Sequence, residues 1–382
     1  MKKYNVIFIL VDGCRVDRIH KTPIFEQLQS QGTFFSQMIS YAPYKLASMN
    51  SIFTGMYGTK NGVDAYYKMF KLNESSKTIA EYLSENGWYT QGDAMRLSLV
   101  SDRGFDKITE HDEKTTNYEV VHCDMLDEIV EKSNGNPFFA YLHYPKIHTS
   151  IVEAVFSKYD DFSDEYFAKK NQNLNDYDSY LSTAGHYLET IFEKIRSLNL
   201  EKDSIIIVMA DHGMGVGEKK GERAYGVYTY DYSIKSFSIF LQPAIFPKGK
   251  KISDLTRTID VMPTILDILE ISHDQNYQQM QGMTLLPLLD GKIKKSFFSK
   301  KSSQERFAFS ETGGLYGPWP SPNEPNVKCI RTNKWKLIHN TTPNTWEFYN
   351  LENDPGENNN IYDENSKTVK ELQKKLEQIQ NE

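Results

Sequence analysis

The sequence predicts an α/β fold: a mostly parallel sheet between helix layers, followed by a small antiparallel C-terminal subdomain. Continuous apolar runs such as "VIFILV" (6–11) and "SIIIVM" (204–209) are typical of strands buried on both faces. Helical patterns alternate with such runs up to about residue 290, which indicates parallel strands. After a polar stretch at 291–303 the pattern changes to short strand-like runs. We therefore expect one domain at 1–300 and a second, smaller unit at 301–382.

Each element of the larger domain has a local signal. Gly55 and Gly87 follow apolar helical patterns and act as helix ends. Besides the two runs above, we expect strands at 137–143 and 237–241. Helices are expected at 23–31, 48–54, 77–86, 177–198 and 253–269, the last interrupted near Pro263.

The residue pattern of the C-terminal unit predicts four short strands and a final helix. The strand-like runs are 307–310, 327–332, 335–339 and 347–349, and the helix is 366–380. The turn at Thr332-Asn333 predicts a hairpin between the second and third strands.

Composition narrows the functional class. Of the 382 residues 39% are hydrophobic and 25% charged, with a net charge of −7 spread along the chain, which disfavours a nucleic-acid binder. Three widely spaced cysteines offer neither a disulfide framework nor a zinc spacing. The apolar run at 6–11 is too short for a signal peptide, and no run is long enough for a membrane span. We expect a cytoplasmic protein with no membrane span.

Acidic residues follow two of the predicted strands. Asp12 comes directly after 6–11, and Asp211-His212 follows 204–209. Sites in open α/β sheets form outside the carboxyl ends of strands, so these residues converge if the strands are neighbours. Two carboxylates and an imidazole then make a site for a divalent metal. The alternative is a helix cap and a polar turn.

Eight motifs occur along the chain in a fixed order: "NVIFILVDGCRVD", "SMNSIFTGMYGTKNGV", "RGFD", "FFAYLHYPKIH", "SIIIVMADHGMGVGE", "IDVMPTILDIL", "FSETGG" and "WEFYNLENDPGENNN". Together they resemble the sulfatase family of the alkaline-phosphatase superfamily. The resemblance covers nearly the whole chain. It implies an alkaline-phosphatase-like fold and hydrolysis of sulfate or phosphate esters or phosphonates. In that chemistry a divalent metal binds the ester oxygen, and a nucleophile at a helix N-terminus attacks in line.

The resemblance assigns site residues by position. Asp12, Asp211 and His212 correspond to metal ligands, while Gly13 stands where typical sulfatases have a second aspartate. In lacking that ligand, the sequence resembles the branch of phosphonate and phosphodiester hydrolases. His148, with His143 nearby, matches a histidine that contacts the ester or protonates the leaving group.

Three cations are candidate substrate contacts. Arg96 falls near the position of a sulfate-binding lysine, and Arg223 follows "DHGMGVGE", where the family places substrate-contacting side chains. Lys146 lies between the two histidines and could bind an anion. The alternatives are a surface lysine for Lys146, an exposed basic loop for Arg223, and a solvated loop histidine for His148.

The nucleophile position falls in "YAPYKLASMNSIFTG", 41–55. Setting residues 41–45 on the pattern Cys-x-Pro-x-Arg puts Tyr41 at the nucleophile and keeps a cation at the fifth position. Counting back from the shared helix end at Thr54-Gly55 puts Lys45 there instead. We prefer the second alignment because an insertion of four residues would add about one helical turn. On either alignment formylglycine cannot form.

An ammonium is not a nucleophile, so Lys45 must have another role at this position. We expect it to pair with Asp12 and Asp211 and to weaken or replace the metal. The alternatives are a displaced helix start with Lys45 in solvent and Ser48 or Thr54 near the metal, or a substitution at a threonine site.

The sequence thus predicts a metal-dependent hydrolase of sulfate or phosphate-type esters, with Lys45 at the nucleophile position. The cofactor is one divalent ion, calcium or magnesium, with manganese or zinc as alternatives, unless Lys45 replaces it. The partner is a small anionic ester, a sulfated or phosphorylated carbohydrate being one candidate. Two rivals remain: a catalytically impaired relative that binds an anionic ligand or partner, and a phosphonate or phosphodiester hydrolase or phosphoryl transferase.

Overall fold

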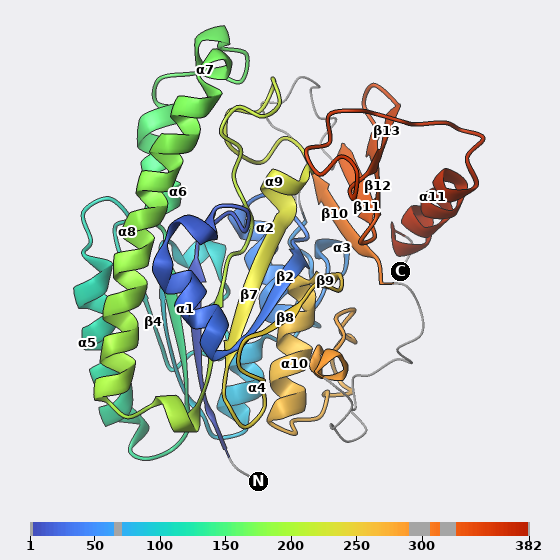
Figure 1. Cartoon of the computed structure of the whole chain (residues 1–382). Helices are drawn as coiled ribbons and strands as arrows, with labels where there is room; N and C mark the ends of the chain where they lie inside the picture. The colour runs from blue at the N-terminus through green and yellow to red at the C-terminus, as the bar shows by residue number, and fades with distance from the viewer. Residues whose placement is uncertain (1–2, 65–70, 290–305, 314–325, 381–382) are drawn as a thin grey trace.

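The computed structural model describes residues 3–64, 71–289, 306–313 and 326–380, and Figure 1 shows their arrangement. The main sheet runs in the order β4-β3-β5-β1-β6-β7-β2-β8, with β9 beside β2. Its strands are β1 (Asn5–Val11), β2 (Thr33–Ile39), β3 (Tyr89–Ala94), β4 (Lys107–Glu110), β5 (Phe138–Tyr144), β6 (Ser204–Met209), β7 (Lys235–Leu241), β8 (Lys250–Ile252) and β9 (Thr256–Arg257).

Most of this sheet is parallel, as the sequence predicted. Strands β4, β3, β5, β1 and β6 all run in one direction. Of the described strands in this sheet, only β7 runs against its neighbours, β6 and β2. The carboxyl ends of the five parallel strands therefore meet at one edge, where a site is expected.

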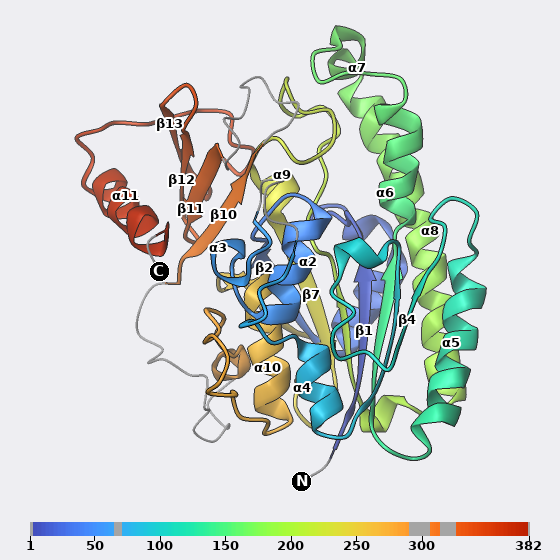
Figure 2. The same ribbon diagram turned by 180° about the vertical axis from the view of Figure 1, so that it is seen from behind.

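Helices cover both faces of the sheet (Figures 1 and 2). The described helices are α1 (Pro23–Gln31), α2 (Lys45–Thr54), α3 (Gly58–Asn61), α4 (Ile79–Glu85), α5 (Tyr118–Ser133), α6 (Lys146–Ile151), α7 (Asp164–Ala168), α8 (Lys170–Ser197), α9 (Asp231–Ile234), α10 (Val261–Ile268) and α11 (Lys367–Gln380). In β1 the side chains of Ile7 and Ile9 face α1, α5 and α8, whereas Val6 and Phe8 face α2, α4 and α10. This explains the continuous apolar run, since these successive side chains enter a core on one face or the other.

The C-terminal unit is a separate antiparallel sheet, as predicted. Its order is β10 (Ala308–Thr312), β11 (Val327–Arg331), β12 (Trp335–Asn340) and β13 (Thr345–Asn350), with β11 and β12 forming the expected hairpin. In Figure 1 it lies beside the main sheet, with α11 against it. The predicted domain boundary at 300/301 lies outside the described residues and stays a prediction.

The structure corrects some predicted elements. Helix α8 begins at Lys170, earlier than the apolar pattern indicated, because its first turns carry few buried side chains. The segment 253–269 is not one helix: it contains β9, a short 3-10 turn and α10. Pro263 falls in the first turn of α10, where a missing N–H costs nothing, so it interrupts no helix.

Several elements were missed altogether: β2, β3, β4 and α5. Strand β3 reads "YTQGDA", and its polar residues hid a strand that is almost wholly buried. Within the described residues no helix is long and apolar enough to cross a membrane.

Candidate active site

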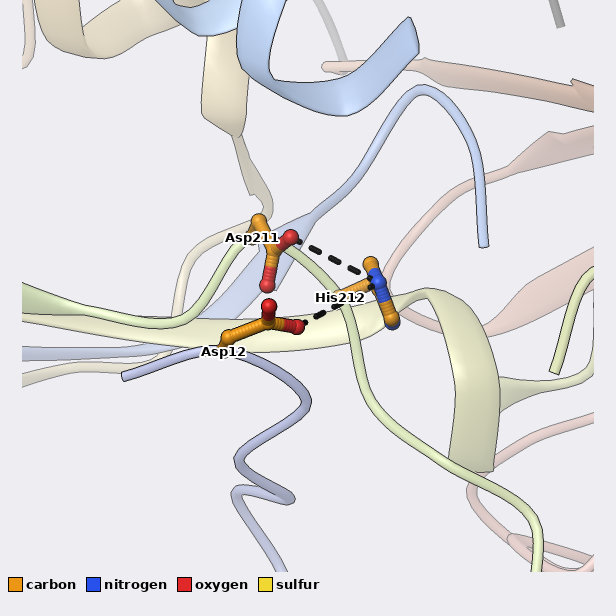
Figure 3. A group of neighbouring side chains, drawn as sticks. All are labelled: Asp12, Asp211 and His212. Atoms are coloured by element: carbon orange, nitrogen blue, oxygen red, sulfur yellow. Dashed lines mark ion pairs between the residues drawn. The ribbon is translucent and has the colours of Figure 1, made fainter. Parts of the chain in front are cut away.

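Two neighbouring strand ends bring the predicted ligands together. Strands β1 and β6 are paired, with Leu10 opposite Met209, so Asp12 and Asp211 leave the sheet side by side. One ligand atom each from Asp12, Asp211 and His212 lies within 4.8 Å of the others, and all three residues are buried. Figure 3 shows the three side chains pointing toward a common space. The expected convergence is therefore found.

The atoms that face this space have no hydrogen-bond partner among the described residues. They are Asp12 Oδ1, Asp211 Oδ2 and His212 Nε2. The Nε2 atom lies 3.5 Å from Asp211 Oδ2 and 3.9 Å from Asp12 Oδ1. His212 Nδ1 is 2.7 Å from the Gly213 carbonyl oxygen, to which it donates, so Nε2 carries the lone pair in a neutral ring. Buried acceptors that face one another without a proton between them fit a bound divalent cation.

Burial and charge act differently on the two carboxyl groups. Burial raises the pKa of Asp211, and the neighbouring Asp12 carboxylate adds to this against the effect of His212. Burial also works against ionisation of Asp12, but Lys45 and the hydrogen bond from His143 outweigh it and hold that pKa well below its usual range. Asp12 is thus the firmly charged member of the pair.

Lys45 is the first residue of α2, and Tyr44 is its N-cap. Its Nζ atom lies 2.5 Å from Asp12 Oδ2 and 3.3 Å from the sulfur of Met95. The residue is only 5% exposed, so the alternative in which Lys45 points to solvent is wrong.

The contact differs in one respect from the hypothesis that Lys45 pairs with both aspartates. Among the residues that the structure describes, Lys45 makes its ion pair with Asp12 alone, through Oδ2, while Oδ1 of the same carboxylate remains directed at the candidate metal space. Lys45 therefore does not occupy the same carboxylate oxygen as a bound cation. The two positive charges are close neighbours but not direct competitors for one atom.

Gly13 stands where a further aspartate was expected by resemblance, and its backbone explains the glycine. Its φ is +70°, a left-handed conformation that side chains rarely adopt. A Cβ atom there would lie 2.5 Å from the terminal methyl of Met214. The Gly13 N–H instead donates to Asp211 Oδ1 over 3.2 Å, which orients that carboxylate.

His143 in β5 and His148 after it have different surroundings. His143 Nε2 lies 3.1 Å from Asp12 Oδ2, and because a carboxylate only accepts, Nε2 carries the proton. Its Nδ1 is buried without a partner among the described residues. His148 lies in α6, with Nε2 3.9 Å from Glu113 Oε2.

Burial and the nearby Lys45 ammonium lower the pKa of His148 to about 3. Its ring is therefore neutral near pH 7. A neutral ring gives up its proton less readily than an imidazolium, and the general-acid role of His148 stays a prediction.

The three predicted cations lie in different places. Lys146 Nζ donates to the Lys114 carbonyl over 2.9 Å, and Arg223 donates to the Tyr159 carbonyl and lies 4.3 Å from the Phe156 ring. These contacts hold both side chains on surrounding loops. Arg96 is exposed and follows Met95, which contacts Lys45. Substrate binding by any of the three remains a prediction.

Sequence reasoning missed several neighbours of the site. Met95 contacts Lys45, Glu113 lies near His148, and the Tyr225 ring packs 5.3 Å from His148 and 5.6 Å from His212. Met95 and Glu113 follow β3 and β4, so recognising those strands would have placed both residues at the correct edge. Tyr225 carries no local signal, since it comes from a long irregular connection between β6 and α9.

Comparison with known families and curated proteins gives consistent matches. The family model "Sulfatase" matches residues 4–271, and the model "N-sulphoglucosamine sulphohydrolase, C-terminal" matches 226–382. The Delta 4,5-hexuronate-2-O-sulfatase of Bacteroides thetaiotaomicron is 24% identical over 50% of this chain and 38% of its own length. The ulvan-active sulfatase of Formosa agariphila is 23% identical over 76% of this chain and 58% of its own. The matched part of the chain thus spans less than two thirds of the length of these relatives.

Solved structures share the fold over their whole length. One, described in complex with its substrate D-glucosamine-2-N,6-O-disulfate, has a TM-score of 0.76 at 18% identity and covers 100% of this chain and 98% of its own. The phosphonate monoester hydrolase of Silicibacter pomeroyi has a TM-score of 0.73 at 17% identity and covers 99% and 94%.

Proposed function

The chain belongs to the sulfatase family, and on that premise we propose that it is a metal-dependent hydrolase of sulfate or phosphate-type esters. One observation carries the proposal: three buried ligand atoms, from Asp12, Asp211 and His212, face one another without partners among the described residues. Lys45 and His143 flank them through the other oxygen of Asp12. An anionic ester group placed there would meet positive charge and hydrogen-bond donors.

Asp12, Asp211 and His212 would hold the cation. Two carboxylates suit calcium, magnesium or manganese, and the imidazole extends the choice to zinc. When bound, the metal would neutralise charge on an ester oxygen. Lys45 adds a second positive charge next to it, which favours binding of a sulfate or phosphate group.

The attacking group needs a separate assignment. The ion-pair partners of Asp12 among the described residues are Lys45, His143 and His212, and none carries a hydroxyl or thiol. Lys45 is held as an ammonium against a carboxylate and has no free electron pair. We therefore assign the attack to water: its oxygen bonds to sulfur or phosphorus, the bond to the alcohol oxygen breaks, and the water proton passes by way of the unpartnered Nδ1 of His143 to the leaving alcohol.

The carbohydrate part of the prediction has support only from relatives. Their names specify a hexuronate sulfatase and an ulvan-active sulfatase, and one neighbour is described with a sulfated glucosamine. For this chain we propose a sulfated or phosphorylated carbohydrate as substrate.

A substrate panel tests the function. Aryl sulfate, phosphate monoester, phosphodiester and phosphonate would be offered to the protein with calcium, magnesium, manganese or zinc. We expect metal-dependent turnover of at least one ester, lost in Asp211→Ala. Preference for the phosphonate or the diester would instead indicate a phosphonate or phosphodiester hydrolase, the alternative that the glycine at position 13 favours.

A specific contact favours the other candidate function, a binding protein without turnover. The Lys45–Asp12 ion pair places a non-nucleophilic cation at the helix start. Lys45→Thr restores a hydroxyl there and belongs in the same panel. Turnover in the variant alone would establish a disabled hydrolase. Turnover in the natural chain would contradict it.

A further inference from the structure

A cavity of about 570 Å³ lies beyond the ends of β3 and β4. Its wall is formed by Met95, Arg96 and residues 110–114. Two wall residues also contact the site itself. Met95 accepts a hydrogen bond from Lys45 over 3.3 Å, and Glu113 lies 3.9 Å from His148. An ester whose anionic group sits at Lys45 would therefore have its alcohol part next to this cavity.

One wall residue, His111, is held by a buried chain of polar groups. Its Nδ1 lies 2.8 Å from Asp93 Oδ1, and the other oxygen of Asp93 lies 2.9 Å from His122 Nε2. His122 Nδ1 is in turn 2.7 Å from the Tyr187 hydroxyl. Asp93 and His122 are fully buried, whereas the His111 side chain is 31% exposed.

This chain determines the protonation pattern. The Asp93 carboxylate only accepts, so His111 Nδ1 and His122 Nε2 both donate to it, and the Tyr187 hydroxyl donates to His122. His111 is thereby left with Nε2 as the ring nitrogen that a ligand can reach. Burying such a network is costly unless every member is satisfied, and here it fixes the orientation of one half-exposed ring.

The rest of the wall mixes donors and acceptors. The Arg96 side chain is exposed and makes no ion pair or hydrogen bond that the described residues provide. Glu110 uses Oε2 to accept from the Leu97 N–H, and Asp112 uses Oδ1 to accept from the 114–115 turn. Each keeps a second oxygen for a ligand. Sugar hydroxyls both donate and accept, and the volume lies within the roughly 300–1,000 Å³ of small-molecule sites.

We propose that this cavity binds the alcohol part of the ester as a polyhydroxylated ring, with His111 and Arg96 as its recognition residues and Asp93 as the residue that positions His111. The inference rests on the proposed function, because it needs the anionic group at Lys45. It adds the residues that recognise the alcohol part of the ester, which the proposed function leaves unassigned.

The test compares two kinds of ester with the same anionic group. The probes are the 6-sulfates of glucose, galactose and N-acetylglucosamine, against cyclohexylmethyl sulfate, which has a six-membered ring without hydroxyls. The corresponding phosphates form a parallel arm. Affinity is measured by calorimetry with each divalent metal present, so turnover is not required.

We expect at least one sugar ester to bind ten times or more tighter than its cyclohexylmethyl counterpart. Arg96→Gln and His111→Phe should each reduce this ratio at least threefold. Asp93→Asn should lower the same ratio and move the His111 proton from Nδ1 toward Nε2, a change of tautomer that the ¹⁵N resonances of the ring report. Arg196→Gln, an exposed arginine near the end of α8, is the matched control and should change nothing.

Failures of the two proposals are distinguishable. If neither ester class binds the natural chain, the proposed function fails and this inference with it. If cyclohexylmethyl esters bind but no sugar ester binds more tightly, the cavity assignment alone is overturned. The same holds if the sugar preference survives in both Arg96→Gln and His111→Phe.

Discussion

At the scale of single residues, position 45 decides the chemistry of the site. Two carboxylates would give a cation a local charge of −2, and the Lys45 ammonium reduces it to −1. The ammonium is buried with Asp12, so solvent screens it little. Yet it uses Oδ2 and leaves Oδ1 unoccupied, so we expect metal binding to be weakened and not abolished.

Replacing Lys45 by methionine keeps the length of the side chain and removes the charge. We expect Lys45→Met to bind manganese or calcium at least tenfold more tightly, about 1.4 kcal/mol, because one positive charge beside the cation is gone. Calorimetric titration measures it. Lys220→Met, at an exposed ion pair, is the control. Equal affinities of Lys45→Met and the natural chain would show that the ammonium does not repel the metal.

His148 predicts a pH dependence of stability. Its pKa is about 3 in the folded protein against 6.5 in an unfolded chain, so below pH 6.5 the unfolded state takes up a proton that the folded state does not. Its contribution to stability is therefore constant above pH 6.5 and declines as the pH falls toward 3, by up to about 4 kcal/mol.

Urea unfolding at pH 7 and pH 5, in the presence of a chelator, measures this effect. His148→Leu should lose less stability between the two pH values than the natural chain. His186→Gln is the control, because that side chain is 73% exposed. If His148→Leu and the natural chain lose the same amount, the neutral buried ring is not the cause.

At the scale of elements, buried charges attach the C-terminal sheet to the main domain. Asp231, the first residue of α9, lies 2.9 Å from Arg331 of β11 and 3.0 Å from Lys336 of β12. Lys336 also contacts Glu357 over 2.7 Å. Burial opposes ionisation of Asp231, but Arg331 and Lys336 outweigh it and lower its pKa. The group satisfies its charges only when both units are in place.

Breaking this group should destabilise the protein. Asp231→Asn leaves Arg331 and Lys336 without their shared carboxylate, and we expect a loss of about 3–5 kcal/mol in the free energy of unfolding. Lys334→Gln removes an exposed ion pair of the same sheet and should cost at most about 1 kcal/mol. Denaturant unfolding compares the two. Similar small losses would mean that the buried charges do not anchor the sheet.

At the scale of the whole molecule, a bound cation would join the ends of β1 and β6 in the centre of the sheet. Those ends form only in the folded chain, so binding must stabilise the fold. A metal at one hundred times its Kd should add about 2.7 kcal/mol to the free energy of unfolding.

Thermal unfolding with and without the metal checks this. The natural chain should unfold at a higher temperature with saturating manganese or calcium, whereas Asp211→Ala should show no such shift. A rise of equal size in Asp211→Ala would place the ion elsewhere in the molecule.

The sequence by itself determined the strands β1, β5 and β6, helix α1, and the C-terminal hairpin. Apolar runs and turn residues are local signals, so they identify such elements without knowledge of their neighbours. The order of motifs also identified the family, and the strand ends indicated Asp12, Asp211 and His212. Strands β3 and β4 were missed because polar residues interrupt their patterns.

Only the tertiary structure decided how these residues act together. Whether Asp12 meets Asp211 depends on the pairing of β1 with β6, which are almost two hundred residues apart in sequence. Burial and distance determine three further features of the site. Lys45 pairs with Oδ2 of Asp12, the ring of His148 is neutral, and a cavity lies beside Met95. These depend on contacts between distant segments, and no local pattern of residues encodes them.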